Sequence, residues 1–157
     1  MNRSGIQIAV VDDDPSFLRA LERLLRAAGF MPLTYASGEA FLLERPRGPL
    51  DCAILDIRLG AMTGLDVARK LTAEECRVPI IFMTAHDDTG PKDEAEALGC
   101  VAYMRKPFSA EPLLEAIRQA TLSNRAAAQV TGGHEREHPQ NRTNTRNPTE
   151  RTRNSKL

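Results

Sequence analysis

The sequence lacks several features that would place it in a class at once. It contains no tryptophan, and aromatic residues make up only 4% of its 157 positions. Its formal net charge at pH 7 is zero, so overall charge gives no reason to expect a nucleic acid or an acidic partner. No stretch approaches the roughly 18 apolar residues of a transmembrane helix, and the amino terminus has no apolar signal segment. We therefore expect a cytoplasmic protein.

Cysteine is also scarce, with only Cys52, Cys76 and Cys100 present. Their number is odd and no two of them have a C-x-x-C spacing, which argues against a disulfide framework and against a zinc site. We expect three reduced and mostly buried thiols in a reducing compartment.

What the sequence does contain is an alternation of short apolar runs and amphipathic helices. Buried strands are predicted at residues 6–11, 52–55, 80–83 and 101–104, and an edge strand at 31–35, where Pro32 interrupts the run. Asp14 is predicted to cap the first helix ahead of Pro15. Residues 63–66 resemble a capping box, which predicts the start of the third helix. This order of strands and helices, with short connections, predicts a parallel α/β sheet.

Polar side chains follow four of the predicted strands. Asp12 and Asp13 follow the first, Asp56 the third, Thr84 the fourth and Lys106 the fifth. Ligands of parallel sheets bind beyond the carboxyl ends of the strands. Each residue alone has an ordinary explanation as a capping or solvated side chain, but their convergence indicates a site. Two carboxylates about 4 Å apart repel by roughly 4 kcal/mol at an effective dielectric of about 20, so this cluster favours Mg²⁺, Ca²⁺ or Mn²⁺.

These groups suit phosphoryl transfer to a carboxylate. Asp56 is central in the predicted sheet and ionised near neutral pH, so it needs no general base to attack phosphorus and form an acyl phosphate. A cation held by Asp12 and Asp13, together with the Lys106 ammonium, would neutralise the phosphoryl oxygens, and the Thr84 hydroxyl would donate to one of them.

Four motifs occur in order: V-V-D-D-D-P, I-L-D-I-R-L-G-A-M-T-G-L, I-F-M-T-A-H and Y-M-R-K-P-F. In order and spacing they resemble the receiver domain of two-component response regulators, and the resemblance covers about residues 5–122. It implies a flavodoxin-like (βα)5 fold with a doubly wound, parallel, five-stranded sheet. It also implies that a sensor histidine kinase phosphorylates Asp56, and that Mg²⁺ is bound by Asp12, Asp13, Asp56 and the backbone carbonyl of Arg58.

The resemblance assigns further roles. Thr84 and Lys106 would contact the phosphoryl group, Tyr103 would be the aromatic switch residue, and the Lys106–Pro107 peptide bond would be cis. Arg58 and His86 would tune the lifetime of the phosphoryl group, with two solvated side chains as the alternative. The helix near 92–98, the strand at 101–104 and the last helix would form the surface for a downstream protein or a second copy. Such a domain is a phosphoacceptor that promotes its own phosphorylation and dephosphorylation, not an enzyme.

A phosphatase of the haloacid-dehalogenase type is the alternative from another class, because the run from Asp12 to Asp14 fits its D-x-D motif. That family has an acidic pair after its lysine, whereas Asp87 and Asp88 precede Lys106. The chain also lacks room for a cap domain. The sequence therefore favours the receiver.

Residues 123–157 carry seven basic and three acidic side chains and few apolar ones. We expect a receiver domain over residues 1–122 and a disordered, basic tail over 123–157, because the tail cannot bury enough surface to offset its ordering entropy. No helix-turn-helix or enzymatic output domain is predicted in it, so we expect a single-domain regulator or phosphorelay protein. The alternative for the tail is contact with nucleic acid, which its scattered charges and lack of aromatic residues disfavour.

Overall fold

Five short strands pair in parallel in the order β2-β1-β3-β4-β5 across the part of the chain that the structure, a computed structural model, describes: residues 5–85 and 89–131. The strands are β1 (Gln7–Val11), β2 (Met31–Tyr35), β3 (Cys52–Asp56), β4 (Ile80–Thr84) and β5 (Ala102–Arg105). The helices are α1 (Pro15–Ala27), α2 (Gly38–Glu44), α3 (Gly64–Ala73), α4 (Thr89–Ala97) and α5 (Ala110–Thr131). This is the predicted flavodoxin-like fold, and β2, with Pro32, lies at the predicted edge.

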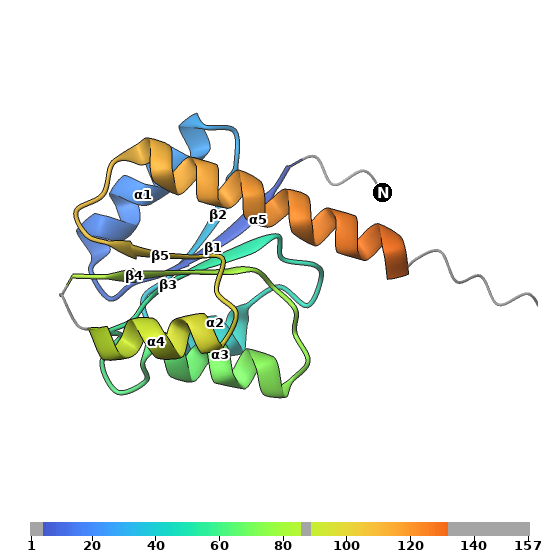
Figure 1. Ribbon diagram of the computed structural model, residues 1–157. Coiled ribbons are helices and arrows are strands. Elements are labelled where there is room, and N and C mark those ends of the chain that lie inside the picture. The colour runs from blue at the N-terminus through green and yellow to red at the C-terminus, as the bar shows by residue number, and fades with distance from the viewer. Residues whose placement is uncertain (1–4, 86–88, 132–157) are drawn as a thin grey trace, which may run out of the picture.

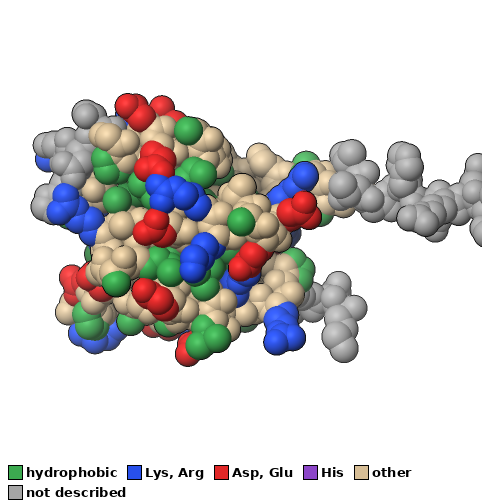
Figure 2. Space-filling view, turned by 90° about the horizontal axis from the view of Figure 1, so that it is seen from below, with side chains coloured by type: hydrophobic (Ala, Val, Ile, Leu, Met, Phe, Trp, Pro, Cys, Tyr) green, Lys and Arg blue, Asp and Glu red, His purple; other side chains and the backbone are tan. Residues whose placement is uncertain are grey.

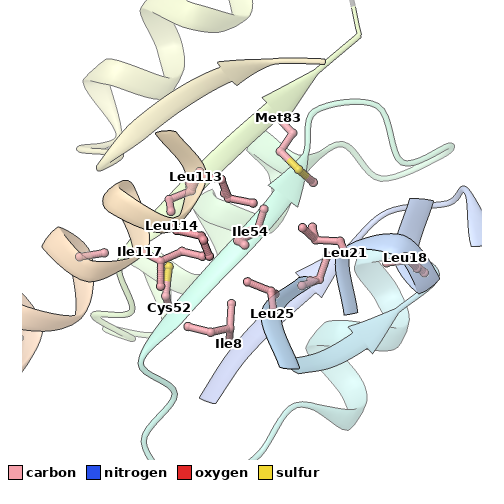
Figure 3. Close-up of a cluster of buried hydrophobic side chains, with 13 residues drawn as sticks. Ile8, Leu18, Leu21, Leu25, Cys52, Ile54, Met83, Leu113, Leu114 and Ile117 are labelled. Carbon is pink, nitrogen blue, oxygen red and sulfur yellow. The ribbon is translucent and has the colours of Figure 1, made fainter. Parts of the chain in front are cut away.

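Helices cover both faces of the sheet, with α1 and α5 on one side and α2, α3 and α4 on the other (Figure 1). Successive side chains of a strand point to opposite faces, so Ile8 and Val10 belong to the core under α1 and α5, and Ala9 and Val11 to the core under the other three helices. Figure 3 shows the first core, in which side chains of β1, β3 and β4 meet those of α1 and α5. Because both faces of β1, β3 and β4 are buried, these three central strands are nearly continuous apolar runs in the sequence.

The outer surface of α2, α3 and α4 is mixed in character. Figure 2 shows acidic and basic side chains interspersed with hydrophobic ones on this face. Arg69 of α3 forms ion pairs with Asp66 of its own helix and with Glu94 of α4, so it links two neighbouring helices at the surface.

The predicted helix starts are confirmed. The Asp14 carboxylate accepts a hydrogen bond of 2.9 Å from the Ser16 amide at the start of α1, where Pro15 occupies the first turn. In the capping box of α3, the Asp66 amide donates to the Thr63 hydroxyl (3.1 Å) and the Thr63 amide donates to the Asp66 carboxylate (3.0 Å). Both caps bond amide groups that lack a partner within the first helical turn.

The last helix is longer than predicted. α5 continues to Thr131, so residues 123–131 are helical and the expectation of a disordered tail from residue 123 is wrong for this stretch. Ala126, Ala127 and Ala128 have the highest intrinsic helix propensity, and they extend a helix whose packed first half has already met the cost of nucleation. In Figure 1, α5 extends past the amino ends of the strands. The remainder of the predicted tail, residues 132–157, lies outside the described residues.

The three cysteines are free thiols, as predicted, but they differ in exposure. Cys52 is buried in β3, and burial raises the pKa of its thiol to about 12. Cys100 is half-buried and Cys76 is exposed, so the prediction of mostly buried thiols is wrong for Cys76, which lies in the connection between α3 and β4. None of the described helices is long and apolar enough to span a membrane.

Candidate functional site

The sheet order brings the predicted site residues to one edge of the sheet. Asp12 directly follows β1, Asp56 and Thr84 end β3 and β4, and Lys106 directly follows β5. β1 pairs with β3, β3 with β4 and β4 with β5, so these four carboxyl ends are consecutive across the sheet. The Lys106 amide donates a hydrogen bond of 2.7 Å to the Thr84 carbonyl, which fixes the chain leaving β5 against the end of β4.

Lys106 joins the two buried carboxylates of this edge. Its ammonium donates to Oδ2 of Asp56 at 2.9 Å and also to Oδ2 of Asp12. Asp12 is fully buried and Asp56 is 7% exposed. The remaining oxygens have backbone partners: the Asp14 amide donates to Oδ1 of Asp12 (2.9 Å), and the Arg58 amide donates to Oδ1 of Asp56 (3.0 Å). We refer to Asp12, Asp56 and Lys106 as the buried charge cluster.

The pKa values of this cluster reflect burial and pairing. Burial raises the pKa of the Asp56 carboxyl, and the Asp12 charge adds to the rise; hydrogen bonds from Lys106 and from the Arg58 amide offset only part of it. Burial acts to lower the pKa of Lys106, but its bonds to Asp12 and Asp56 outweigh burial and raise that pKa. The lysine therefore stays charged, whereas the Asp56 carboxylate has less stabilisation than it would have in water.

The carboxylates are also arranged to hold a cation. Asp12, Asp13 and Asp56 each present an oxygen, and these oxygens lie within 4.8 Å of one another. Octahedral Mg²⁺ has ligand oxygens at about 2.0–2.1 Å, hence about 3–4 Å from one another, and it prefers carboxylate oxygen. Asp13 is exposed while the other two are buried, so an ion here would lie at the mouth of the site. The donor set fits Mg²⁺.

An aromatic ring also contacts the Lys106 ammonium. Nζ of Lys106 lies 4.0 Å from the centre of the Phe17 ring, and that ring packs edge-on against Phe108 with centres 6.2 Å apart. An ammonium over a ring face is stabilised by the ring quadrupole. In the sequence, Phe17 is one residue of the apolar face of the first helix. Its position in the first turn, just after the acidic run, is the one sequence feature that points to this contact.

Gly64 supports the Asp56 backbone at close range. A Cβ atom at Gly64 would lie 2.2 Å from the Asp56 carbonyl oxygen and 3.0 Å from its carbonyl carbon. The Gly64 amide donates to the Ile57 carbonyl at 3.0 Å, so the start of α3 is held against the residues that follow β3. In the sequence, Gly64 is a residue of a capping box. Its contact with Asp56 could not be predicted, because the contact forms only when α3 packs back against the end of β3.

The other predicted site residues have varied outcomes. Tyr103 packs against the core under α2, α3 and α4, and its hydroxyl oxygen is buried. Arg58 is exposed, and the role of its backbone carbonyl stays a prediction. The Lys106–Pro107 peptide bond is cis, as predicted. His86, Asp87 and Asp88 lie outside the described residues.

We predict that Gly64→Ala lowers the free energy of unfolding by about 1–3 kcal/mol, the usual cost of forcing an extra group into a packed site. Urea titration measures this. Gly90→Ala in α4 is the matched control, because the added Cβ has no described atom within 4 Å apart from its chain neighbours and the backbone of its own helix. This variant should leave stability unchanged or raise it slightly. Equal stability of the Gly64 and Gly90 variants would show that the close approach to Asp56 is not a constraint.

Comparison with known proteins identifies the family. A family model described as the response regulator receiver domain matches residues 8–118. Among curated proteins, the response regulator protein TmoT of Ectopseudomonas mendocina is 40% identical over 120 residues, 76% of this chain and 54% of TmoT. The transcriptional regulatory protein FixJ of Bradyrhizobium diazoefficiens is 32% identical over 121 residues, 77% of this chain and 59% of FixJ. The chain thus spans about half the length of the curated relatives it matches.

Solved structures give the same result. The response regulator StyR is 35% identical with a TM-score of 0.77, covering 82% of this chain and 65% of StyR. A response regulator receiver domain protein from Clostridium thermocellum is 26% identical with a TM-score of 0.72, covering 78% of this chain and 98% of that protein. With four strand ends carrying the groups described above, the chain belongs to the receiver domain family of two-component response regulators.

Proposed function

We propose that this domain accepts a phosphoryl group on Asp56 from a sensor histidine kinase, in a Mg²⁺-dependent reaction, and signals through protein contacts. The observation that carries the proposal is the buried charge cluster beside Asp13, at the carboxyl edge of the sheet. A carboxylate oxygen of Asp56 attacks phosphorus, the bond from phosphorus to the kinase histidine nitrogen breaks, and the imidazole leaves with its electron pair. The product is an acyl phosphate.

The surrounding groups have separate tasks in this proposal. The Arg58 amide orients Asp56, and Lys106 neutralises the charge that moves onto Asp56 with the phosphoryl group. The buried Thr84 hydroxyl, at the end of the adjacent strand, donates to a phosphoryl oxygen. Mg²⁺ bound by Asp12, Asp13, Asp56 and the Arg58 carbonyl would supply further neutralisation. In this proposal the domain promotes its own phosphorylation and dephosphorylation. The match of the receiver family model to residues 8–118 leaves the phosphatase of the haloacid-dehalogenase type without support.

The proposed setting is the cytoplasm. All three cysteines are free, and Cys76 is exposed, which suits a reducing compartment. The sensor kinase would present its phosphohistidine to this domain in the same compartment.

Asp56→Asn is predicted to abolish phosphorylation, because it removes the nucleophile but keeps the size of the side chain. The intact mass of the protein after incubation with Mg²⁺ and a small acyl-phosphate donor reports the result: one phosphoryl adduct on the wild type and none on the variant. Asp51→Asn is the matched control, since Asp51 is also buried but bonds the Gln7 amide at the opposite end of β3. An adduct on the Asp56 variant at the wild-type rate would refute the assignment.

The two metal-binding carboxylates of the first loop are predicted to differ in their effect on stability. Asp13→Ala should abolish Mg²⁺-dependent phosphorylation while raising stability in metal-free buffer by up to about 1 kcal/mol, because an exposed repelling charge is lost. Asp12→Ala should cost about 3–5 kcal/mol, because it breaks a buried ion pair. Urea titration without metal compares the two. A destabilised Asp13 variant would contradict the cation-site interpretation.

Phe17→Leu is predicted to slow phosphorylation roughly fivefold, because loss of about 1 kcal/mol of cation–π stabilisation leaves Lys106 less well placed. Phe17→Tyr keeps a ring over the ammonium and should retain the wild-type rate. Phe108→Leu removes the ring that packs against Phe17 but keeps the Phe17 ring itself, and it serves as the packing control. If Leu and Tyr at position 17 give the same rate, the ring has no positioning role.

Signalling is proposed to pass through Thr84 and Tyr103 to α4. Phosphorylation would draw the Thr84 hydroxyl toward the phosphoryl group. The ring of Tyr103, a β5 residue that lies beside Phe82 of the adjacent β4, would fill the space that Thr84 leaves. The Tyr103 hydroxyl oxygen is already buried, so this movement of the ring would take place within the protein and not inward from the surface. Of the α4 side chains that the structure describes, only Ala95 is fully buried, which leaves α4 loosely anchored. The surface of α4, β5 and α5 would bind the downstream protein or a second copy.

Hydrogen exchange with and without a phosphoryl mimic is predicted to differ over residues 84–108. The expected change is a shift in protection in β5 and α4, with β1 and β3 unaltered as internal controls. Unchanged protection throughout this range would leave Asp56 as a phosphate relay without a switch.

A further inference from the structure

A groove lies at the amino ends of the strands, at the opposite end of the sheet from Asp56. Its volume is about 610 Å³. Its walls come from the end of α2 and the segment leading to β3, from the connection between α3 and β4, and from the second half of α5. Asn124 and Ala128 line the α5 wall, so the groove depends on the part of α5 that lies beyond the predicted domain boundary.

The groove is basic. Arg45, Arg47 and Arg77 line it, and its lining includes no carboxylate. Among the described residues, Arg45 pairs with Glu74, whereas neither Arg47 nor Arg77 has a carboxylate within ion-pair distance. One guanidinium nitrogen of Arg45 is buried without a hydrogen-bond partner among the described residues. That nitrogen is not open to a ligand, so the positive charge that the groove offers comes chiefly from the exposed Arg47 and Arg77.

The groove also has an apolar floor. Leu42, Leu50 and Val78 lie at the margin of the core under α2, α3 and α4 and line the groove. Leu43 stands beside them with 84% of its surface exposed, the largest fraction among the exposed large hydrophobic side chains of the described residues. Apolar side chains flanked by unpaired arginines are the arrangement by which protein surfaces bind peptides with hydrophobic anchors and acidic flanks.

Charge complementarity decides between the possible occupants. The chain's own residues 132–157 follow α5 in the sequence, but they carry six basic side chains against three acidic ones and would be repelled by the groove. A second copy would bring the same basic groove. We propose that this groove binds an acidic, leucine-containing peptide segment of a partner protein, independently of the phosphoacceptor site.

Cys76 provides a direct readout, because it lines the groove and its thiol is exposed. The probe is a short, helix-forming peptide of leucine and glutamate, added to the full chain during alkylation with iodoacetamide. We expect the peptide to slow alkylation of Cys76 severalfold and to leave Cys100, which does not line the groove, unchanged. The counterpart peptide with lysine in place of glutamate should give no protection. Equal protection by the two peptides would overturn the proposal, as would no protection by either.

Charge reversal tests the arginines. The double variant Arg47→Glu, Arg77→Glu should bind the acidic peptide at least about tenfold more weakly, whereas Arg23→Glu on the exposed surface of α1 should not change binding. Phosphorylation of Asp56 should be the same in both variants, since the groove lies at the other end of the sheet.

Other occupants of the groove would give different results. Stronger protection of Cys76 by single-stranded DNA or by anionic lipid vesicles than by the acidic peptide would reject a peptide partner. Protection that accompanies self-association, detected by sedimentation, would assign the groove to a second copy.

Discussion

The bonds that the Lys106 ammonium makes to two buried carboxylates are the constraint on which the rest of the structure depends. Burial of Asp12 and Asp56 is tolerable only because one cation and two backbone amides complete their hydrogen bonding. The partners come from distant parts of the chain: Asp12 follows β1, Asp56 ends β3, and Lys106 follows β5. β4 lies between β3 and β5, so the lysine side chain has to reach across the end of β4, about two strand spacings or 9–10 Å from strand to strand.

That requirement explains the supporting contacts around the cluster. The hydrogen bond from the Lys106 amide to the Thr84 carbonyl holds the Lys106 backbone in place, and the Phe17 ring contacts the ammonium at the other end of the side chain. Gly64 lets α3 approach the Asp56 backbone more closely than any side chain would allow. The parallel sheet thus separates two ends with different character. The carboxyl end gathers carboxylates around a cation, and the amino end carries arginines around an apolar groove.

Much of this could be predicted from the sequence, for physical reasons. Strands buried on both faces are visible as apolar runs, Asp14 and Thr63 mark helix starts through their side-chain oxygens, and the site residues directly follow the strands. The contacts of Phe17 with Lys106 and of Gly64 with Asp56 could not, because they join segments that only the tertiary fold brings together. The length of α5 does not follow from the few apolar residues of this stretch, because the helix propensity of Ala126 to Ala128 extends the helix without burial. The exposure of Cys76 depends on its place in a connection between α3 and β4, which composition does not reveal.

The pKa of the Asp56 carboxyl, followed by NMR titration, tests the buried charge cluster most directly. We expect a value above the ordinary one of about 3.9, because burial outweighs the bonds from Lys106 and Arg58. Linkage then requires this group's contribution to stability to fall as pH rises from the unfolded pKa to the folded pKa, and to stay constant above it. Adding Mg²⁺ should lower the pKa, and Lys106→Met should raise it further. A pKa at or below the ordinary value, unmoved by Mg²⁺ or by loss of the lysine, would contradict the account.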